Sequence, residues 1–403
     1  MTTPKPKSQG LIKSLVGIRG YLSVVVVAVH LAPFAIALAP VTRPVFLPIW
    51  HHAYVALDMF FVLSGFVVTA GYRKVFARWP GWGVFGKFLW ARLSRFYPVH
   101  LAVLAVLVGA VLGARAIGRE IPHGGDLGVD LLRQITLTSG WGGADSLTWN
   151  GPVWSLSAEW FCYLLLPLLQ PLVLLLRTRW ACLAGYLVAC AIPLVSYTII
   201  GFDDGTITYG MPLPRALGFF LAGACLQQLV HVDRRVPELA GRITGPLAIA
   251  ALGLIVLTSN LQLSTMYALP VVGLVVLALG EERGWLDRVL STRFSMVFGE
   301  VSVAIFLTHV PWLLGASLLI NPRTFPGAWG WLGIALLLVG VGVCGWLAFV
   351  LVEKPGQRIM RAMVKRPAKA PAASVEERTE AVVESPAPSA PREEARDEAR
   401  TGR

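Results

Sequence analysis

Long runs of apolar residues, separated by short polar segments, repeat along most of the chain. Several of these runs reach about 20 residues, and a helix of that length crosses a hydrocarbon layer of roughly 30 Å. The pattern predicts an all-α protein, a polytopic transmembrane helical bundle of about ten spans. The predicted spans cover residues 12–32, 53–72, 94–113, 154–176, 180–200, 214–231, 245–260, 265–280, 297–320 and 328–352.

The polar segments divide the chain into three parts. Residues 1–11 are predicted to be a cytoplasmic N-terminal segment, and residues 12–355 hold all the apolar runs. Residues 356–403 are predicted to be a basic juxtamembrane segment and a disordered cytoplasmic tail. The disorder is predicted for residues 367–403, whose composition buries too little apolar surface to fold. The longest connection between spans, residues 114–153, contains an amphipathic stretch, "DLGVDLLRQITL".

Lysine and arginine are unevenly distributed between the two sides of the predicted bundle. With the N-terminus in the cytoplasm, 22 of them fall in inner segments and 6 in outer segments. Cytoplasmic loops of membrane proteins carry such an excess, which explains the formal charge of +12 without a nucleic-acid partner. Both ends are therefore predicted to be cytoplasmic, with membrane lipids around the spans.

Composition agrees with this class. Hydrophobic residues make up 55% of the chain and charged residues only 14%, against about a quarter in soluble domains. The five cysteines all fall in apolar runs, without CxxC spacing or a cluster with histidine. This pattern indicates neither a disulfide framework nor a metal site.

Four ionisable residues lie inside predicted spans, where they are costly and by default mark a functional site. They are Arg19, His30, Asp58 and Glu159. Arg19 and His30 are eleven residues apart, so they return to within about 20° of the same helix face, separated by roughly 16 Å along the axis. His30, Asp58 and Glu159 are predicted to lie at one depth, in the outer half of the membrane.

An imidazole with nearby carboxylates has what a general base needs, since its pKa is near neutrality and a partner fixes its tautomer. His30 is the predicted base, with Asp58 or Glu159 orienting it. Simpler interpretations remain open at this stage. The same pattern is expected of an interfacial histidine with a satisfied hydrogen bond. The carboxylates are equally expected in a structural ion pair or a helix cap.

Arg92 and Arg95 flank the cytoplasmic start of the third predicted span on one helical face, in the stretch "ARLSRFYPVH". Charge alone favours a topological role with phospholipid contacts. The alternative is a clamp for a phosphorylated ligand, because guanidinium forks bind phosphate at two points.

Six motifs, in the same order, resemble those of the membrane-bound acyltransferase-3 family. They extend from about residue 15 to 355, which is nearly the whole predicted transmembrane domain. They are "GIRGYLSVVVVAVH", "ALDMFFVLSGFVVT", "ARLSRFYPVH", "GPVWSLSAEWFCYLLLPLL", "FGEVSVAIFLTHVPW" and "VEKP".

The resemblance implies transfer of an acyl group, commonly acetyl, from cytoplasmic acyl-CoA to a hydroxyl of a sugar or glycosylated product in the plasma membrane of a bacterium. It implies no permanently bound cofactor, since acetyl-CoA or another acyl-CoA is the donor substrate. By match to the motifs, Arg19, His30, Arg92 and Arg95 form the functional set, with the arginines holding the donor.

Two positions depart from the family pattern. Val16 stands where the family often has Asp, and Glu159-Trp160 replaces a Glu-Glu pair. These departures leave open which carboxylate orients the histidine and which acceptor is used. No esterase domain is expected after the spans, because residues 356–403 are too few to form one.

Other classes of function are also compatible with these residues. A transporter of a lipid-linked sugar, an acylated lipid or an antibiotic also needs intramembrane charges, but the chain has no internal repeat. A scaffold or sensor explains the tail and leaves Arg19 and His30 without a role. Within the enzyme interpretation, the acceptor is either a cell-surface glycan or a small lipophilic product such as a macrolide.

Overall fold

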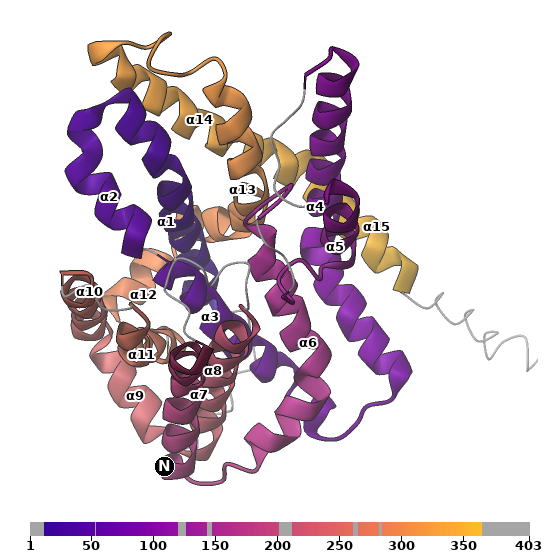
Figure 1. Ribbon diagram of the computed structural model, residues 1–403. Helices are drawn as coiled ribbons and strands as arrows, with labels where there is room; N and C mark the ends of the chain where they lie inside the picture. Colours follow the sequence, from indigo (N-terminus) through magenta and orange to yellow (C-terminus); the bar gives the residue numbers. More distant parts are fainter. Residues whose placement is uncertain are drawn as a thin grey trace, which may run out of the picture. The chain divides into compact units, whose positions relative to one another are not determined.

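The computed structural model describes residues 12–52, 54–119, 126–142, 147–200, 212–260, 265–281 and 284–364. The chain divides into two units, residues 1–361 and 362–403. The described residues form helices and connections, with no strand among them, which confirms the predicted all-α class. The helices in Figure 1 are α1 (Lys13–Leu38), α2 (Arg43–His52), α3 (Val55–Tyr72), α4 (Trp82–Ala116), α5 (Leu127–Thr136), α6 (Val153–Leu174), α7 (Arg179–Ile200), α8 (Leu213–Val232), α9 (Arg235–Arg242), α10 (Thr244–Asn260), α11 (Leu269–Leu279), α12 (Trp285–Leu290), α13 (Arg293–Ser317), α14 (Gly330–Ala348) and α15 (Lys354–Val364).

Within the described ranges, eight helical stretches are long and apolar enough to cross a membrane, or nine if the bent pair α9–α10 is one span. They correspond to eight of the ten predicted spans, so the count of ten is not confirmed. The predicted span 245–260 corresponds to α10, which meets α9 at a bend of 77°. The predicted span 265–280 corresponds to α11, whose 11 residues extend only about 16 Å, roughly half the hydrocarbon thickness. The cytoplasmic location of both ends stays a prediction, and residues 1–11 and 365–403 lie outside the described residues.

Helix α4 begins at Trp82, well before the predicted start at residue 94. Pro80 and Gly81 precede it, and Gly81 has a φ of +84°, which a glycine adopts without strain. The helix then continues for 35 residues and passes through Pro98. Hydropathy marks where a helix enters lipid rather than where it begins, so the first turns, which carry two glycines and Lys87, were not predicted. Arg92 and Arg95 consequently lie inside the helix, about three turns from its start.

Helices α3 and α8 are the most deeply buried of the long helices and pack against each other. They approach to backbone contact at two glycines. A Cβ on Gly65 would clash with the carbonyl group of Phe220, and a Cβ on Gly223 would clash with that of Val62. Small residues at such crossings allow transmembrane helices to approach closely. This contact fixes α3, which supplies a wall of the site described below.

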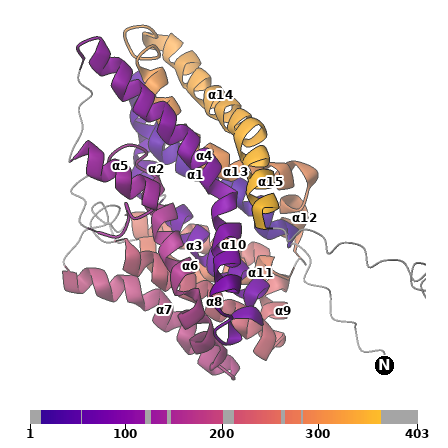
Figure 2. The ribbon, with the colours of Figure 1, turned by 90° about the vertical axis from the view of Figure 1, so that its right-hand side faces the viewer.

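Helices α1, α13 and α14 form a second packed group, in which α13 contacts the other two. Helix α14 continues through a π-helical turn, Phe349–Glu353, into α15, as Figure 2 shows. This turn contacts α4, and the Trp90 indole on α4 donates a hydrogen bond of 2.6 Å to the carbonyl of Met360. The C-terminal end of the bundle is thereby attached to the helix that carries Arg92 and Arg95.

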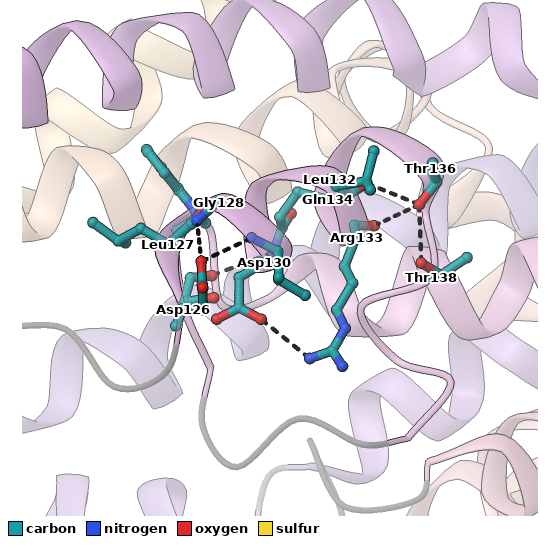
Figure 3. Close-up of polar contacts among 12 residues, drawn as sticks. Asp126, Leu127, Gly128, Asp130, Leu132, Arg133, Gln134, Thr136 and Thr138 are labelled. Carbon is teal, nitrogen blue, oxygen red and sulfur yellow. Dashed lines mark hydrogen bonds and ion pairs between the residues drawn. The ribbon is translucent and has the colours of Figure 1, made fainter.

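The connection between α4 and α6 carries the short helix α5 (Figure 3). Asp126 caps its N-terminus, with Oδ1 accepting hydrogen bonds from the backbone N–H groups of Gly128 at 2.7 Å and Val129 at 3.1 Å. Arg133 pairs with Asp130 at 3.2 Å, one turn apart on the same face. The amphipathic stretch in this connection is therefore a helix.

Candidate functional site

Five helices surround an internal cavity with about 880 Å³ of empty space, part of it open to the outside. Its charged side chains are Arg19 from α1, Arg92 and Arg95 from α4, and Glu159 from α6. The structure thus brings together four of the six predicted site residues. The apolar walls come from α3 and α13, and include Leu57, Phe60, Phe61, Val67, Val68, Val303 and Phe306.

The three guanidinium groups of this cavity have no carboxylate partner. Among the described residues, none of them lies within 4 Å of a carboxylate oxygen. The guanidinium carbon of Arg92 lies 5.1 Å from the ring centroid of Tyr72 and 5.5 Å from that of Phe88, and its Nε is buried without a hydrogen-bond partner. Three fixed positive charges therefore face one carboxylate, Glu159, in the described lining. Such a surplus favours binding of an anion, and guanidinium forks suit phosphate in particular.

Glu159 is the end of a chain of hydrogen bonds along the cavity wall. Its Oε1 accepts a bond of 2.6 Å from the hydroxyl of Tyr163, one helical turn away. The Tyr163 oxygen also lies 3.0 Å from the hydroxyl of Ser64 on α3. Since Tyr163 has one proton and gives it to the carboxylate, Ser64 is the donor to Tyr163. Glu159 is thus held within the arginine cluster and makes no hydrogen bond to His30.

His30 is paired with a second histidine, His309 of α13. The Nδ1 atom of His30 lies 2.9 Å from the carbonyl oxygen of Val26 and 3.3 Å from Nε2 of His309. The two rings are 4.9 Å apart and nearly perpendicular, at 73°. His309 is fully buried, and its Nδ1 lies 2.7 Å from the carbonyl oxygen of Phe306. His30 is only partly buried.

The histidine pair lies beside the cavity rather than in its lining. Ser302 and Phe306 of α13 line the cavity, and His309 follows on the same helix face, at i+7 and i+3. The Phe306 ring, whose centroid is 5.8 Å from that of His309, is the last lining residue on this helix. Arg19 therefore lines the cavity, whereas His30, on the same face of α1, does not.

Asp58 is held in a buried ion pair away from His30. Its two carboxylate oxygens accept hydrogen bonds from Nε and Nη2 of Arg215 on α8, at 2.5 and 2.9 Å. The side chains of Arg215 and Asp58 are 2% and 0% exposed, so the pair is excluded from solvent. The two-point geometry joins α3 to α8. No hydrogen bond links His30 to Asp58, and the side chain within hydrogen-bond distance of His30 is that of His309.

Replacing Asp58 with asparagine is expected to destabilise the bundle by about 3–5 kcal/mol, because it removes the charge that compensates a buried guanidinium. A fall in the thermal unfolding temperature in detergent measures this effect. The double variant Asp58→Leu with Arg215→Met should recover part of the loss, since it removes both charges. A stable but inactive Asp58→Asn protein would instead assign the carboxylate to the chemistry.

Two of these contacts could not be predicted from spacing along the chain. The charge count places Arg215 in an outer segment, whereas the structure buries its side chain against α3. His309 lies within the motif "FGEVSVAIFLTHVPW". The sequence did contain a signal for it as a functional residue, because it is a titratable residue inside an apolar run. Within the described ranges, no group of three His, Cys, Asp or Glu side chains is placed to hold a metal ion.

This geometry defines a class of protein, namely a helical membrane protein with a cationic internal cavity and an adjacent pair of imidazole rings. The chain matches the acyltransferase-3 family, described as an acyltransferase domain, over residues 12–351, and it belongs to this family of membrane acyltransferases.

Two curated relatives match the chain to different extents. The chain is 26% identical to the acyltransferase MdmB of Streptomyces mycarofaciens over 372 residues, which cover 87% of this chain and 92% of the relative. It is 36% identical to protein 2 in the picA locus of Rhizobium radiobacter over 70 residues, which cover 17% of this chain and 36% of that one. No solved structure matches the chain.

Proposed function

We propose that this membrane acyltransferase transfers an acyl group, most simply acetyl, from cytoplasmic acyl-CoA to a hydroxyl group. The observation that carries the proposal is the surplus of unpaired guanidinium groups inside the bundle. An acyl-CoA carries several phosphates at one end and a reactive thioester at the end of a long thin arm. A cationic pocket that continues into an apolar cavity is complementary to both parts.

The donor end of the site is formed by Arg92 and Arg95. They lie three residues apart on one face of α4, and both line the cavity. In the proposal they bind the phosphates as charge-assisted forks, and Glu159 limits the positive charge in the empty cavity. Arg19, on α1, meets the arm as it passes between α3 and α13, whose apolar side chains pack against it.

His30 acts as the general base of the transfer step. It takes the proton of the acceptor hydroxyl as the oxygen attacks the thioester carbonyl, which forms a C–O bond. The C–S bond then breaks, and the proton passes from the imidazolium to the sulfur, so the products are an ester and free CoA thiol. Because His30 lies outside the cavity lining while Phe306 is the lining residue one turn from His309, the proposal requires the thioester to pass Phe306, whose ring turns aside.

The acceptor belongs to the opposite side of the membrane from the donor. In the proposal, both chain ends are in the cytoplasm of a bacterial cell and the acceptor is a cell-surface glycan or a glycosylated metabolite, which undergoes O-acetylation. The lysine and arginine distribution supports this orientation. A lipophilic acceptor would reach His30 laterally from the bilayer, whereas a surface glycan would approach from outside.

Release of free thiol from acetyl-CoA tests the proposal directly. Purified protein in detergent, supplied with acetyl-CoA and extracts of cell-surface glycan or secreted glycosides, should release thiol and add an acetyl mass to one acceptor. A transporter would bind or move its ligand without thiol release. Absence of both thiol and acetylated product with every acceptor extract would contradict the proposed reaction.

A further inference from the structure

The histidine pair contains four ring nitrogens, and three of them have partners. In His309, Nδ1 contacts the Phe306 carbonyl and Nε2 contacts His30. In His30, Nδ1 contacts both the Val26 carbonyl and His309. The remaining nitrogen, Nε2 of His30, has no hydrogen-bond partner among the described residues and is not one of the buried unpartnered atoms. It is therefore the nitrogen of the pair that is available to a substrate.

The carbonyl groups fix the protons on both rings. A carbonyl oxygen only accepts hydrogen bonds, so Nδ1 of His309 must carry a proton, and the neutral ring then has a lone pair on Nε2. Nδ1 of His30 faces the Val26 carbonyl and must also carry a proton. That N–H group is shared between the Val26 oxygen and the Nε2 lone pair of His309. The Nε2 atom of His30 consequently has a lone pair, which is the form required of a base.

We infer that His309 is the positioning residue of the reaction, and that it replaces the carboxylate expected beside a catalytic histidine. This inference rests on the proposed function, because it assigns a role to the base of that reaction. When His30 takes a proton at Nε2, its Nδ1–H group becomes a stronger hydrogen-bond donor. The lone pair on Nε2 of His309 accepts this hydrogen bond. A neutral acceptor holds the imidazolium without a second buried charge, which suits a site inside a bilayer.

Two substitutions at His309 separate this role from packing. The Oε1 atom of glutamine is the same number of bonds from Cα as Nε2 of histidine, so His309→Gln keeps an acceptor beside His30. His309→Met has similar length but only a weakly accepting sulfur. His309→Met should lower kcat about 10- to 100-fold with the KM for acetyl-CoA unchanged, and His309→Gln should keep most of the activity. Equal kcat values for the two variants, whether both low or both normal, would overturn the assignment.

A second measurement does not depend on turnover. Diethyl pyrocarbonate reacts with an unprotonated imidazole nitrogen, and mass spectrometry of peptides reports which histidine is modified. In the wild-type protein, His30 should react and His309 should be protected. Modification of His309 at a rate equal to that of His30 would show that its Nε2 lone pair is not occupied by the N–H group of His30, and would overturn the inferred pairing. If wild-type protein releases no thiol from acetyl-CoA, the proposed function fails, and the labelling pattern still decides whether His30 presents its free nitrogen as inferred.

Discussion

Replacement of His30 by alanine is expected to lower the rate of acyl transfer by about 10²–10⁴-fold, the usual contribution of a general base. The substitution removes the only ring nitrogen of the histidine pair that lacks a partner among the described residues. The arginines proposed to bind the donor lie on other turns and helices, so the KM for acetyl-CoA should change little. Thiol release, measured with purified protein over a range of acetyl-CoA concentrations, gives both parameters.

The matched control is His231→Ala. His231 is an exposed histidine near the end of α8, outside the cavity lining. It should retain wild-type activity, and both variants should be recovered from the membrane in similar amounts. A His30→Ala enzyme that transfers acetyl at the wild-type rate would remove this residue from the chemistry.

Replacement of both Arg92 and Arg95 by glutamine is expected to have an effect of similar size on donor use. A hydrogen bond to a charged group contributes about 1.5–3 kcal/mol, so loss of two should lower kcat/KM for acyl-CoA by roughly 10²–10⁴-fold. Most of the change should appear in KM, because in the proposal the arginines bind the phosphates equally in the ground state and the transition state. Lysine should replace either arginine poorly, since an ammonium group lacks the two-point fork.

Lys87→Gln is the control for charge and topology. Lys87 is exposed on the same helix and does not line the cavity, so its loss removes a positive charge without touching the proposed donor site. Direct binding of CoA by calorimetry should be weakened in the double arginine variant and unchanged in Lys87→Gln. If all these variants bind CoA equally, the two arginines serve membrane topology alone.

The fold class followed from the sequence because apolar length is a direct physical requirement of a membrane span. Helix boundaries were less predictable, as α4 shows, since its first turns carry Lys87 and glycines and have low hydropathy. The short helix α11 shows the opposite difficulty. Its run is apolar throughout, but only the structure shows that it ends after 11 residues.

Side-chain partners were predictable only where they lie on one helix. The spacing of Arg92 and Arg95 placed them on a common face, and the structure places both in one cavity. The partners of Asp58 and His30 are Arg215 and His309, which lie 157 and 279 residues further along the chain. A shared depth in the membrane does not show which helices face each other, and no single sequence carries that information. The predicted catalytic roles of these residues stay predictions.

The central claim is that the internal cavity holds the acyl-CoA donor with its thioester directed toward His30. A cryo-electron microscopy structure of the protein with a non-hydrolysable acetyl-CoA analogue tests it most directly. The expected map shows phosphate density within hydrogen-bond distance of Arg92 and Arg95, and the acyl end beyond a displaced Phe306, next to Nε2 of His30. Density for the nucleotide at another surface, with the cavity empty and Phe306 unmoved, would contradict the account.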